Sequence, residues 1–476
     1  MCVFFLSMSE KSSIFAVDFM NRSTICAIST PPGVGGIAVI RVSGEQAIAT
    51  VDSLFVGRGS LCAMPANTIR HGQIVRGGEV LDEVMCSVFR APHSFTGEDT
   101  VEIACHGSLY IQRELVQWLV DAGCSVARPG EFTQRAFLNG KMDLAQSEAV
   151  ADLIAAQSKA EKDLAFSQLR GAVSEELKNL RERLLHFTSL IELELDFADH
   201  EELEFADRSE LNELADEIER KLHSLMSSFR TGNAIRNGIP VAIIGAPNVG
   251  KSTLLNGLLG DDRAIVSDIQ GTTRDTIEET VVIDDILFRL IDTAGLRETK
   301  DKIENLGIER TLRAAEKAQI VIEMSAPEVL DNDATALPNE RKQGLLNDAK
   351  GTIIKVLNKC DLVDGASLQG ETNGSRLCIS AKNGEIEPLK RELVRVAKEQ
   401  LQSTSAVMLS NARHYEAVCR AHEAIERVQE GLQQGLSGEL LSLDLQDCLS
   451  ALGEITGQIT NAEVLSNIFS KFCIGK

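Results

Sequence analysis

The chain has 476 residues, and at roughly 150 residues per domain this length predicts about three domains. Its 48 Lys and Arg residues against 70 Asp and Glu residues give a net charge of −22, which argues against a chain-wide basic surface for nucleic acid but allows a local RNA site. No apolar run in the sequence approaches the roughly 18 residues that span a bilayer. The eleven cysteines lack a CxxC pair or regular spacing, so we expect reduced thiols in a cytoplasmic protein.

The N-terminal part of the chain alternates short β-branched runs with turn residues. Residues 1–20 resemble neither a signal peptide nor a transit peptide, so we expect a disordered or mis-started extension there. Residues 21–140 follow the pattern of an α/β or α+β domain. The predicted elements of this domain are strands at 24–28, 37–42, 84–89 and 100–105, a tight turn at 31–36, and a helix at 109–120.

Two helical stretches, 141–236 and 397–476, flank a second α/β block at 237–396. In each stretch the apolar residues step by four and three, which is typical of one buried helix face. The two stripes are Val173, Leu177, Leu180, Leu184, Phe187 and Ile191, and Leu441, Leu445, Cys448, Leu452, Ile455 and Ile459. We therefore predict one helical domain with an α/β domain inserted into it, an arrangement that needs the ends of the insert to lie close together.

The inserted block opens with a phosphate-binding motif. GAPNVGKS, from Gly245 to Ser252, follows an apolar strand and precedes a helix, which is the context that this motif requires. The glycines allow backbone N–H groups to surround the phosphates, and Lys251 would reach the β- and γ-phosphates. The Ser252 hydroxyl would bind Mg²⁺.

Further motifs follow in the order expected of a GTP-binding domain. GTTRD at 271–275 supplies Thr273 as a second magnesium ligand, and DTAG at 292–295 ends a strand. Asp361, in NKCD, can accept hydrogen bonds from both donors of guanine, a pair that adenine does not offer. The predicted GTP-binding residues are Asn248, Val249, Gly250, Lys251, Ser252, Thr253, Ser267, Asp268, Ile269, Gln270, Gly271, Thr272, Thr273, Asp292, Thr293, Ala294, Gly295, Asn358, Lys359, Asp361, Ser380, Ala381 and Lys382.

The residue after DTAG is Leu296, where Ras-type switches place a glutamine that orients the attacking water. Leucine cannot do this. Either GTP hydrolysis is slow, or another group positions the water. Glu298 and Glu304 follow closely, and Glu304 is the candidate catalytic residue; the alternative is that both are solvated acids.

Long stretches of the chain resemble the tRNA modification GTPase MnmE (TrmE) family. They are TPPGVGGIAVIRVSG (30–44), SFTGEDTVEIACHG (94–107), ARPGEFTQRAFLNGKMDLAQSEAVADLI (127–154) and the terminal FCIGK, and the resemblance runs from about residue 21 to the end. It implies a tetrahydrofolate-binding and dimerisation domain over 21–140, a helical domain, and an inserted G domain.

The resemblance also implies a reaction and its partners. A homodimer would join the flavoprotein MnmG in a heterotetramer. Together they would add a carboxymethylaminomethyl or aminomethyl group at carbon five of the wobble uridine of certain tRNAs. The one-carbon unit would come from 5,10-methylene-tetrahydrofolate, with 5-formyl-tetrahydrofolate as a bound analogue, and GTP, Mg²⁺ and K⁺ would serve the G domain.

Several residues acquire roles only through this resemblance. The implied folate-binding residues are Arg41, Glu102, Lys141 and Lys476, and the implied potassium ligands are Asn248, Ser267, Ile269 and Thr272. Taken alone, each folate residue reads as a surface ion-pair residue. The chain departs from the family pattern at Val34, usually basic, at Ser267, often Thr, and at SAP (325–327), where an Asp is usual.

Cys473 lies in FCIGK, and the resemblance brings this tail towards the folate site. A thiol beside a lysine can serve as a nucleophile, so Cys473 is a candidate catalytic residue. The alternative is a packing role. Prenylation is disfavoured, because terminal Lys476 is not a usual signal for it.

Other functions remain possible from the sequence. One is a switch GTPase of the Era or Der type, which binds RNA or assists ribosome assembly without modifying tRNA. A second is a structural helical dimer with a vestigial G domain, although its motifs are intact. The chain shows no GXXG loop in the basic helical context of a KH domain, and GVGG at 33–36 lacks the helix and acid of a dinucleotide fingerprint.

Overall fold

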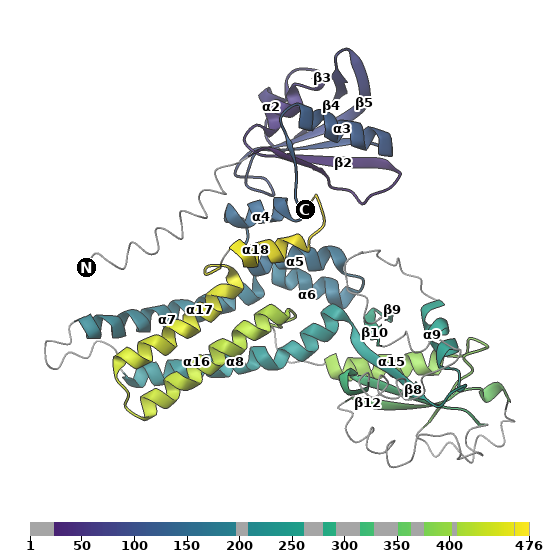
Figure 1. Ribbon diagram of the computed structural model, residues 1–476, viewed down its shortest axis with the longest axis vertical. Coiled ribbons are helices and arrows are strands. Elements are labelled where there is room, and N and C mark those ends of the chain that lie inside the picture. The colour runs from purple at the N-terminus through teal and green to yellow at the C-terminus, as the bar shows by residue number, and fades with distance from the viewer. Residues whose placement is uncertain are drawn as a thin grey trace. The chain divides into compact units, whose positions relative to one another are not determined.

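A computed structural model gives the fold of the protein (Figure 1). It describes residues 23–196, 208–260, 279–291, 315–327, 351–362, 376–401, 407–460 and 462–475. The chain divides into two compact units. Unit 1 comprises residues 1–151, 169–178 and 452–476, and unit 2 comprises 152–168 and 179–451. The extension at 1–20 lies outside the described residues.

Unit 1 is built on a seven-stranded sheet with the order β3-β4-β5-β6-β2-β1-β7. Neighbouring strands are antiparallel except β1 and β7, which are parallel. The strands are β1 (Ile25–Ile28), β2 (Gly35–Ser43), β3 (Phe55–Gly57), β4 (Thr68–Arg76), β5 (Glu79–Phe89), β6 (Thr100–Gly107) and β7 (Ser125–Val126). The four strands predicted from sequence are confirmed, but the predicted turn ends early because Gly35 and Gly36 already belong to β2.

One face of this sheet is covered by two helices, α2 (Ala47–Asp52) and α3 (Leu109–Asp121). Ile40, Val42 and Ile103 point to this face and pack with Trp118 of α3 in one apolar core. Because side chains alternate along a strand, Arg41 and Glu102 point to the opposite face. The sheet therefore separates its apolar core from the charged pair singled out by the sequence.

The opposite face carries α4 (Glu131–Leu138), whose Phe132 is fully buried against Ile25 and Ala27 of β1. Unit 1 also contains the start of α5 (Leu144–Ala155) and α18 (Ala462–Ser470). The C-terminal tail returns to the sheet, where the Ser29 hydroxyl donates to the carbonyl of Gly475 at 3.1 Å. A Cβ on Gly475 would come within 2.3 Å of the Ile28 carbonyl oxygen, so only glycine allows this approach.

Unit 2 contains a six-stranded sheet with the order β13-β12-β11-β8-β10-β9. All neighbours are parallel except the edge pair β9 and β10. The strands are β8 (Ile239–Gly245), β9 (Glu279–Ile283), β10 (Ile286–Leu290), β11 (Ile320–Ser325), β12 (Thr352–Leu357) and β13 (Leu377–Cys378). The helices α9 (Lys251–Gly260) and α15 (Glu387–Leu401) contribute Leu254, Leu255, Leu389 and Leu393 to its core.

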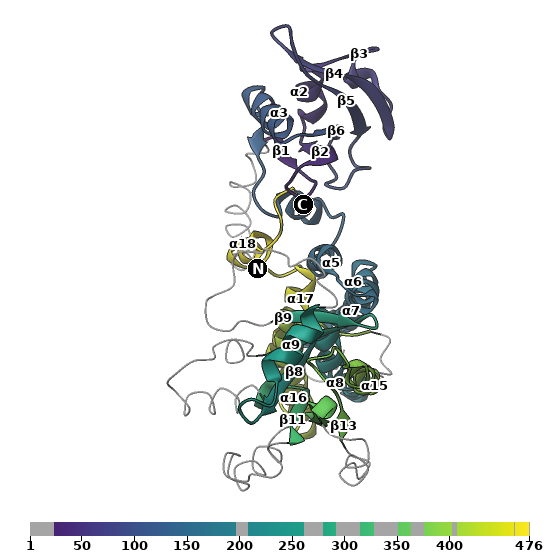
Figure 2. The same ribbon diagram turned by 90° about the vertical axis from the view of Figure 1, so that its right-hand side faces the viewer.

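Long helices form the rest of unit 2; Figure 1 shows them along their length, and Figure 2 shows them nearly end-on. They include α6 (Lys159–Leu169), α8 (Arg208–Asn237), α16 (Ala412–Gln433) and parts of α7 (Ala172–Asp196) and α17 (Gly438–Thr456). Neighbouring helices are joined by polar pairs: Arg183 with Glu217, His422 with Glu219, Arg427 with Asp444, and Gln446 with Glu192. Among the described residues, no helix is long and apolar enough to cross a membrane.

The two apolar stripes predicted from sequence largely form buried helix faces. Val173, Leu177, Leu180, Leu184 and Ile191 are buried in α7, and Phe187 is half-buried. The second stripe ends sooner than predicted. α17 stops at Thr456 because Gly457 adopts a φ of 81°, so Ile459 lies beyond the helix and is 41% exposed.

The chain enters the six-stranded sheet from α8 and leaves it through α15. The segment that follows α15 then returns to α8. The backbone N–H of Leu409 donates to the Ser228 hydroxyl at 3.1 Å, and a Cβ on Gly232 would lie 2.1 Å from the Leu409 carbonyl oxygen. This close approach is what an inserted domain requires. The predicted boundary at 396 falls inside α15, and the domain boundaries stay a prediction.

Candidate functional site

The phosphate-binding loop connects β8 to α9. Gly245, Asn248 and Gly250 adopt φ values of 157°, 63° and 100°. Asparagine is one of the few residues other than glycine that tolerates the left-handed region. A Cβ on Gly250 would lie 2.3 Å from the side-chain nitrogen of Asn358, so the loop requires glycine there for space as well as for its backbone angle.

Lys251 turns back into this loop. Its Nζ atom donates to the carbonyl oxygens of Gly245 and Ala246, each at 2.9 Å. Burial of the ammonium lowers the pKa of Lys251. The cation is thus held by two acceptors that phosphate oxygens can replace, which fits a nucleotide phosphate in this loop.

Asn358 joins the phosphate-binding loop to the base-binding side of the pocket. Its Nδ2 donates to the carbonyl oxygen of Val249 at 2.8 Å, and its Oδ1 accepts from the backbone N–H of Ala381 at 2.9 Å. The residue is only 3% exposed. β8, β12 and β13 belong to one largely parallel sheet, in which β11 lies between β8 and β12, so the loops after their carboxyl ends share one edge. The side chain therefore ties three loops that carry the predicted motifs.

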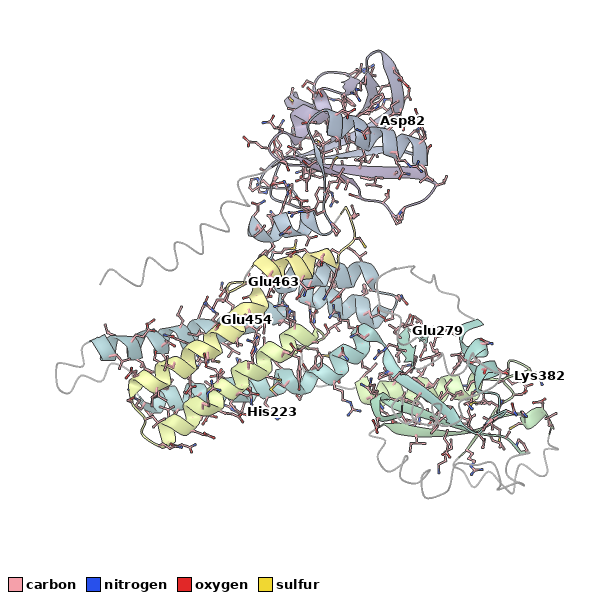
Figure 3. The ribbon with its side chains drawn as sticks, viewed as in Figure 1. Asp82, His223, Glu279, Lys382, Glu454 and Glu463 are labelled. Carbon is pink, nitrogen blue, oxygen red and sulfur yellow. The ribbon has the colours of Figure 1, made fainter. Side chains whose placement is uncertain are left out.

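The guanine-recognition residues lie beside this bridge. The Ser380 hydroxyl donates to Oδ1 of Asp361 at 2.7 Å, which fixes the carboxylate. Lys359 adopts a φ of 63° between Asn358 and the short helix η2 (Cys360–Leu362). Lys382 lies in the turn after β13 and is marked in Figure 3. The structure thus brings together the predicted residues of NKCD and SAK.

Other predicted residues lie outside the described part of the chain. They are Ser267, Asp268, Ile269, Gln270, Gly271, Thr272, Thr273, Asp292, Thr293, Ala294, Gly295, Glu298, Glu304 and Lys476. Their roles stay predictions. In the sequence, Asp292 directly follows Ile291, whose N–H donates to the Val241 carbonyl at 2.9 Å, at the end of β10.

In unit 1, Arg41 and Glu102 pair directly. The Nε and Nη2 atoms of Arg41 lie 3.0 and 2.8 Å from Oε1 of Glu102. The guanidinium lies 5.3 Å from the ring centroid of Phe95 and 5.6 Å from that of Phe132, and its side chain is 13% exposed. A half-covered carboxylate beside a cation and two aromatic rings fits a flat, amide-bearing ring such as a pterin.

The other folate candidates lie around the same face. The Nζ atom of Lys141 donates to the Pro92 carbonyl at 2.9 Å, in the loop that carries Phe95. Gly475 lies against Ile28 of β1. The preceding residue, Ala27, is paired with Arg41 on the neighbouring strand β2. The Cys473 carbonyl accepts from Gly130 N–H at 3.3 Å, and Cys473 itself is exposed.

Sequence reasoning missed a buried charge network behind this pair. Arg135 contacts Glu98 at 3.1 Å and Glu131 at 3.0 Å, and these three side chains are only 11–13% exposed. Burial acts to raise the pKa of Glu131, but hydrogen bonds from the Arg128 backbone and the Arg135 guanidinium outweigh it and hold the pKa below its usual value. The motifs at 94–107 and 127–154 contain these residues, but only the fold pairs them.

Comparisons with known proteins agree with this architecture. The family model described as "GTP-binding protein TrmE N-terminus" matches residues 24–141, and the model "MnmE helical domain" matches residues 144–473. The tRNA modification GTPase MnmE of Parabacteroides distasonis is 55% identical over 95% of this chain and 100% of its own length. The protein of that name from Bacteroides fragilis (strain ATCC 25285) is 51% identical, over 96% and 100%.

A solved structure of Era with MgGDPNP and a 16S ribosomal RNA segment is 27% identical, over 39% of this chain and 65% of that one, with a TM-score of 0.25. The phosphate-binding loop, the guanine-recognition motif and the flanking domains define a multidomain P-loop GTPase. The chain belongs to the tRNA modification GTPase MnmE family, and it is a GTP hydrolase that acts in tRNA modification.

The low pKa of Glu131 makes a prediction about stability and pH. Glu131→Gln should lower the free energy of unfolding by about 1.5–3 kcal/mol at pH 7, because it removes a charged acceptor from Arg135. A depressed carboxyl pKa contributes stability above the unfolded-state pKa of about 4.3 and loses it as pH falls through the folded-state value. The difference between variant and wild type should therefore shrink as the pH falls below the unfolded-state pKa of about 4.3.

The measurement is urea unfolding followed by the fluorescence of Trp118, the only tryptophan of the chain, which is buried in the core of unit 1. Glu45→Gln removes the same charge at an exposed position and should change stability by less than about 0.5 kcal/mol. A Glu131 variant as stable as wild type at pH 7 would contradict the network.

Proposed function

We propose that this GTPase requires potassium and works with a flavoprotein partner, MnmG, in a heterotetramer built on its own homodimer. The pair adds a carboxymethylaminomethyl or aminomethyl group at carbon five of the wobble uridine of certain tRNAs, using a tetrahydrofolate one-carbon unit, in the cytoplasm. The observation that carries this proposal is that one chain holds both the Asn358-bridged nucleotide pocket and the Arg41–Glu102 pair among aromatic rings.

The nucleotide pocket divides its work among the described residues. Lys251 exchanges its two loop carbonyls for phosphate oxygens, and backbone N–H groups of the loop face the same phosphates. Asp361, held by Ser380, accepts from the guanine base. Ser252 and Thr273 hold Mg²⁺, which neutralises phosphate charge when it is bound.

Asn248 occupies a left-handed position at the tip of the phosphate-binding loop and is exposed. We assign its side-chain oxygen to potassium, together with oxygens of Ser267, Ile269 and Thr272. The cation supplies positive charge beside the phosphates, where it stabilises the transition state. Leu296 stands where Ras-type switches place the glutamine that orients the attacking water, so another group must take that role. Glu304 positions the attacking water in this proposal.

The folate site uses unit 1. Glu102 accepts from the amide and amino edge of the pterin while Arg41 holds the carboxylate in place, and Lys141 and Lys476 attract the glutamate tail. Cys473, at the exposed end of the same tail, serves the modification chemistry and has no part in GTP hydrolysis.

The function is tested by mass spectrometry of wobble nucleosides from tRNA treated with this chain, the flavoprotein, GTP, methylene-tetrahydrofolate and a nitrogen donor, ammonium in one sample and glycine in another. Wild type should form the modified uridine. Lys251→Ala should lose both GTP turnover and modification, because turnover drives the cycle. Cys473→Ser should keep potassium-stimulated GTP turnover and lose modification. If wild type hydrolyses GTP but leaves the tRNA unmodified, the proposed reaction is wrong. If Cys473→Ser modifies tRNA normally, the Cys473 thiol has only a packing role.

The base pocket predicts a change of nucleotide preference. In Asp361→Asn, Ser380 can keep its hydrogen bond to the amide oxygen, so the amide N–H faces the base. GTP affinity should fall about tenfold to a hundredfold, because a charge-assisted acceptor is lost. Xanthosine triphosphate should gain affinity, since its carbonyl accepts from the new N–H. Titration of both nucleotides against both proteins decides, and an unchanged preference would refute the pocket assignment.

Potassium dependence is tested at constant ionic strength. Turnover should fall about 100-fold when sodium replaces potassium, because a group that stabilises the transition state is removed. Asn248→Gly deletes the oxygen without backbone strain at a φ of 63°, and it should abolish the difference. Asn248→Asp keeps an oxygen at the same place and should retain part of the potassium response. Equal wild-type rates in the two cations would disprove the assignment.

A further inference from the structure

Two cysteines meet at the edge of the guanine pocket. The Cys360 thiol donates to the carbonyl oxygen of Leu357 at 3.2 Å, and the neighbouring Cys378 thiol adds to the rise of the Cys360 pKa that burial causes. The backbone brings them together independently of the side chains. Cys378 is the register partner of Leu357, and the N–H of Cys360 donates to the carbonyl of Ile379 at 3.2 Å. The strand pairing and this backbone hydrogen bond therefore hold both cysteines in one small region.

Cys360 and Cys378 are both half-buried, so solvent can reach part of each residue. Among the described residues, Cys26 and Cys124 also lie near enough to shift each other's pKa, but these residues are only 0% and 4% exposed. Oxidation of a thiol requires access by the oxidant. The two pairs share their chemistry and differ in accessibility, so the buried pair is an internal control.

The position of the exposed pair connects it to the nucleotide. Cys360 stands between Lys359 and Asp361, two residues from the Asn358 bridge. Cys378 precedes Ser380, which holds the Asp361 carboxylate. A bond between the two sulfurs would act directly on the segments that position both ends of the base pocket.

We propose that Cys360 and Cys378 form a reversible disulfide that weakens guanine-nucleotide binding. In this reaction the two thiols lose two protons and two electrons as the S–S bond forms. A disulfide oxidant of the glutathione type accepts both electrons and leaves as two thiols, and a dithiol reductant reverses the step. The proposal rests on the guanine pocket described above and adds its regulation.

The effect on binding follows from distance. The sulfurs of a disulfide lie about 2.05 Å apart, closer than the atoms joined by any hydrogen bond. Closing the bond draws η2 towards β13, while the Ser380–Asp361 contact of 2.7 Å and the two Asn358 contacts are already short. The carboxylate must then leave its position for the base, and the affinity for guanine nucleotides should fall about tenfold or more.

Burial and the neighbouring thiol raise the pKa of Cys360 to about 12, so this thiol is protonated at neutral pH. Protonated thiols react slowly, which favours a response to sustained oxidising conditions over a fast peroxide sensor. The full-length protein should accordingly be equilibrated for hours in glutathione buffers of defined potential before any measurement.

The sequence makes the bond easy to detect. Trypsin cuts after Lys359, Arg376 and Lys382, so Cys360 and Cys378 fall in separate peptides, 360–376 and 377–382, each with one cysteine. Mass spectrometry should find these peptides joined after oxidation and separate after dithiothreitol. Cys26 and Cys124 should stay reduced in the same folded sample.

Binding of a fluorescent GDP analogue is then titrated in the reduced and oxidised states. Oxidised wild type should bind about tenfold or more weakly, with recovery in dithiothreitol. Cys360→Ser and Cys378→Ser should each bind equally in both states. Cys62→Ser, which removes an exposed thiol in unit 1, should still respond to oxidation.

Three results would overturn the proposal: the two peptides never join, they join without a change in affinity, or the serine variants respond like wild type. A reduced wild type that binds no guanine nucleotide would overturn the base pocket as well. Failure of the switch is thereby distinguished from failure of the pocket, because the reduced protein tests the pocket alone.

Discussion

The nucleotide pocket depends on the two hydrogen bonds of the Asn358 side chain. They span the phosphate-binding loop after β8 and the turn after β13, and both partners are backbone groups in a nearly water-free region. A buried donor or acceptor left without a partner costs about 1–3 kcal/mol, so each loop is stable in this position mainly while the other is present. The absence of a Cβ on Gly250 gives the amide its space, and the Ser380–Asp361 contact extends the same set of bonds towards the base.

The helical part of unit 2 depends on a close crossing of a different kind. Gly232 and Ser228 of α8 receive the returning chain at Leu409, and Gln168 of α6 donates to the carbonyl of Met408 and to the Ser410 hydroxyl. Because the backbone at Leu409 packs directly against Gly232, neither segment can shift far from this position. As a result, helices that precede and follow the six-stranded sheet in the sequence join one bundle. Its apolar faces are inside, and its charged pairs lie at the surface.

Unit 1 shows how buried charge can support a binding surface. Arg135 pairs with both Glu98 and Glu131, and this holds α4 against β1, so that the ring of Phe132 lies beneath Arg41. The C-terminal tail adds a second support through Ser29 and Gly475. A hydrophobic pair could replace the ions for stability alone. The orientation of the Arg41–Glu102 pair, however, needs an aromatic floor that only this arrangement supplies.

The sequence by itself determined the chemistry that resides in short contiguous motifs. The spacing of Gly245, Gly250 and Lys251 predicts a phosphate loop, and Asp361 predicts a preference for guanine. The stepping of apolar residues predicts the strands and helices, because each of these patterns depends on local backbone geometry. The sequence overestimated the length of α17, since the apolar period continues to Ile459 while Gly457 ends the helix.

Only the tertiary structure decided which distant groups meet. Asn358 and Val249 are 109 residues apart, Ser29 and Gly475 are 446 apart, and the register of β12 and β13 pairs Cys378 with Leu357, three residues before Cys360. Hydrogen bonds between separate segments depend on strand order, on register and on where each loop returns. Local periodicity does not encode those quantities, because they are set by how whole sheets and helices pack to bury their apolar faces.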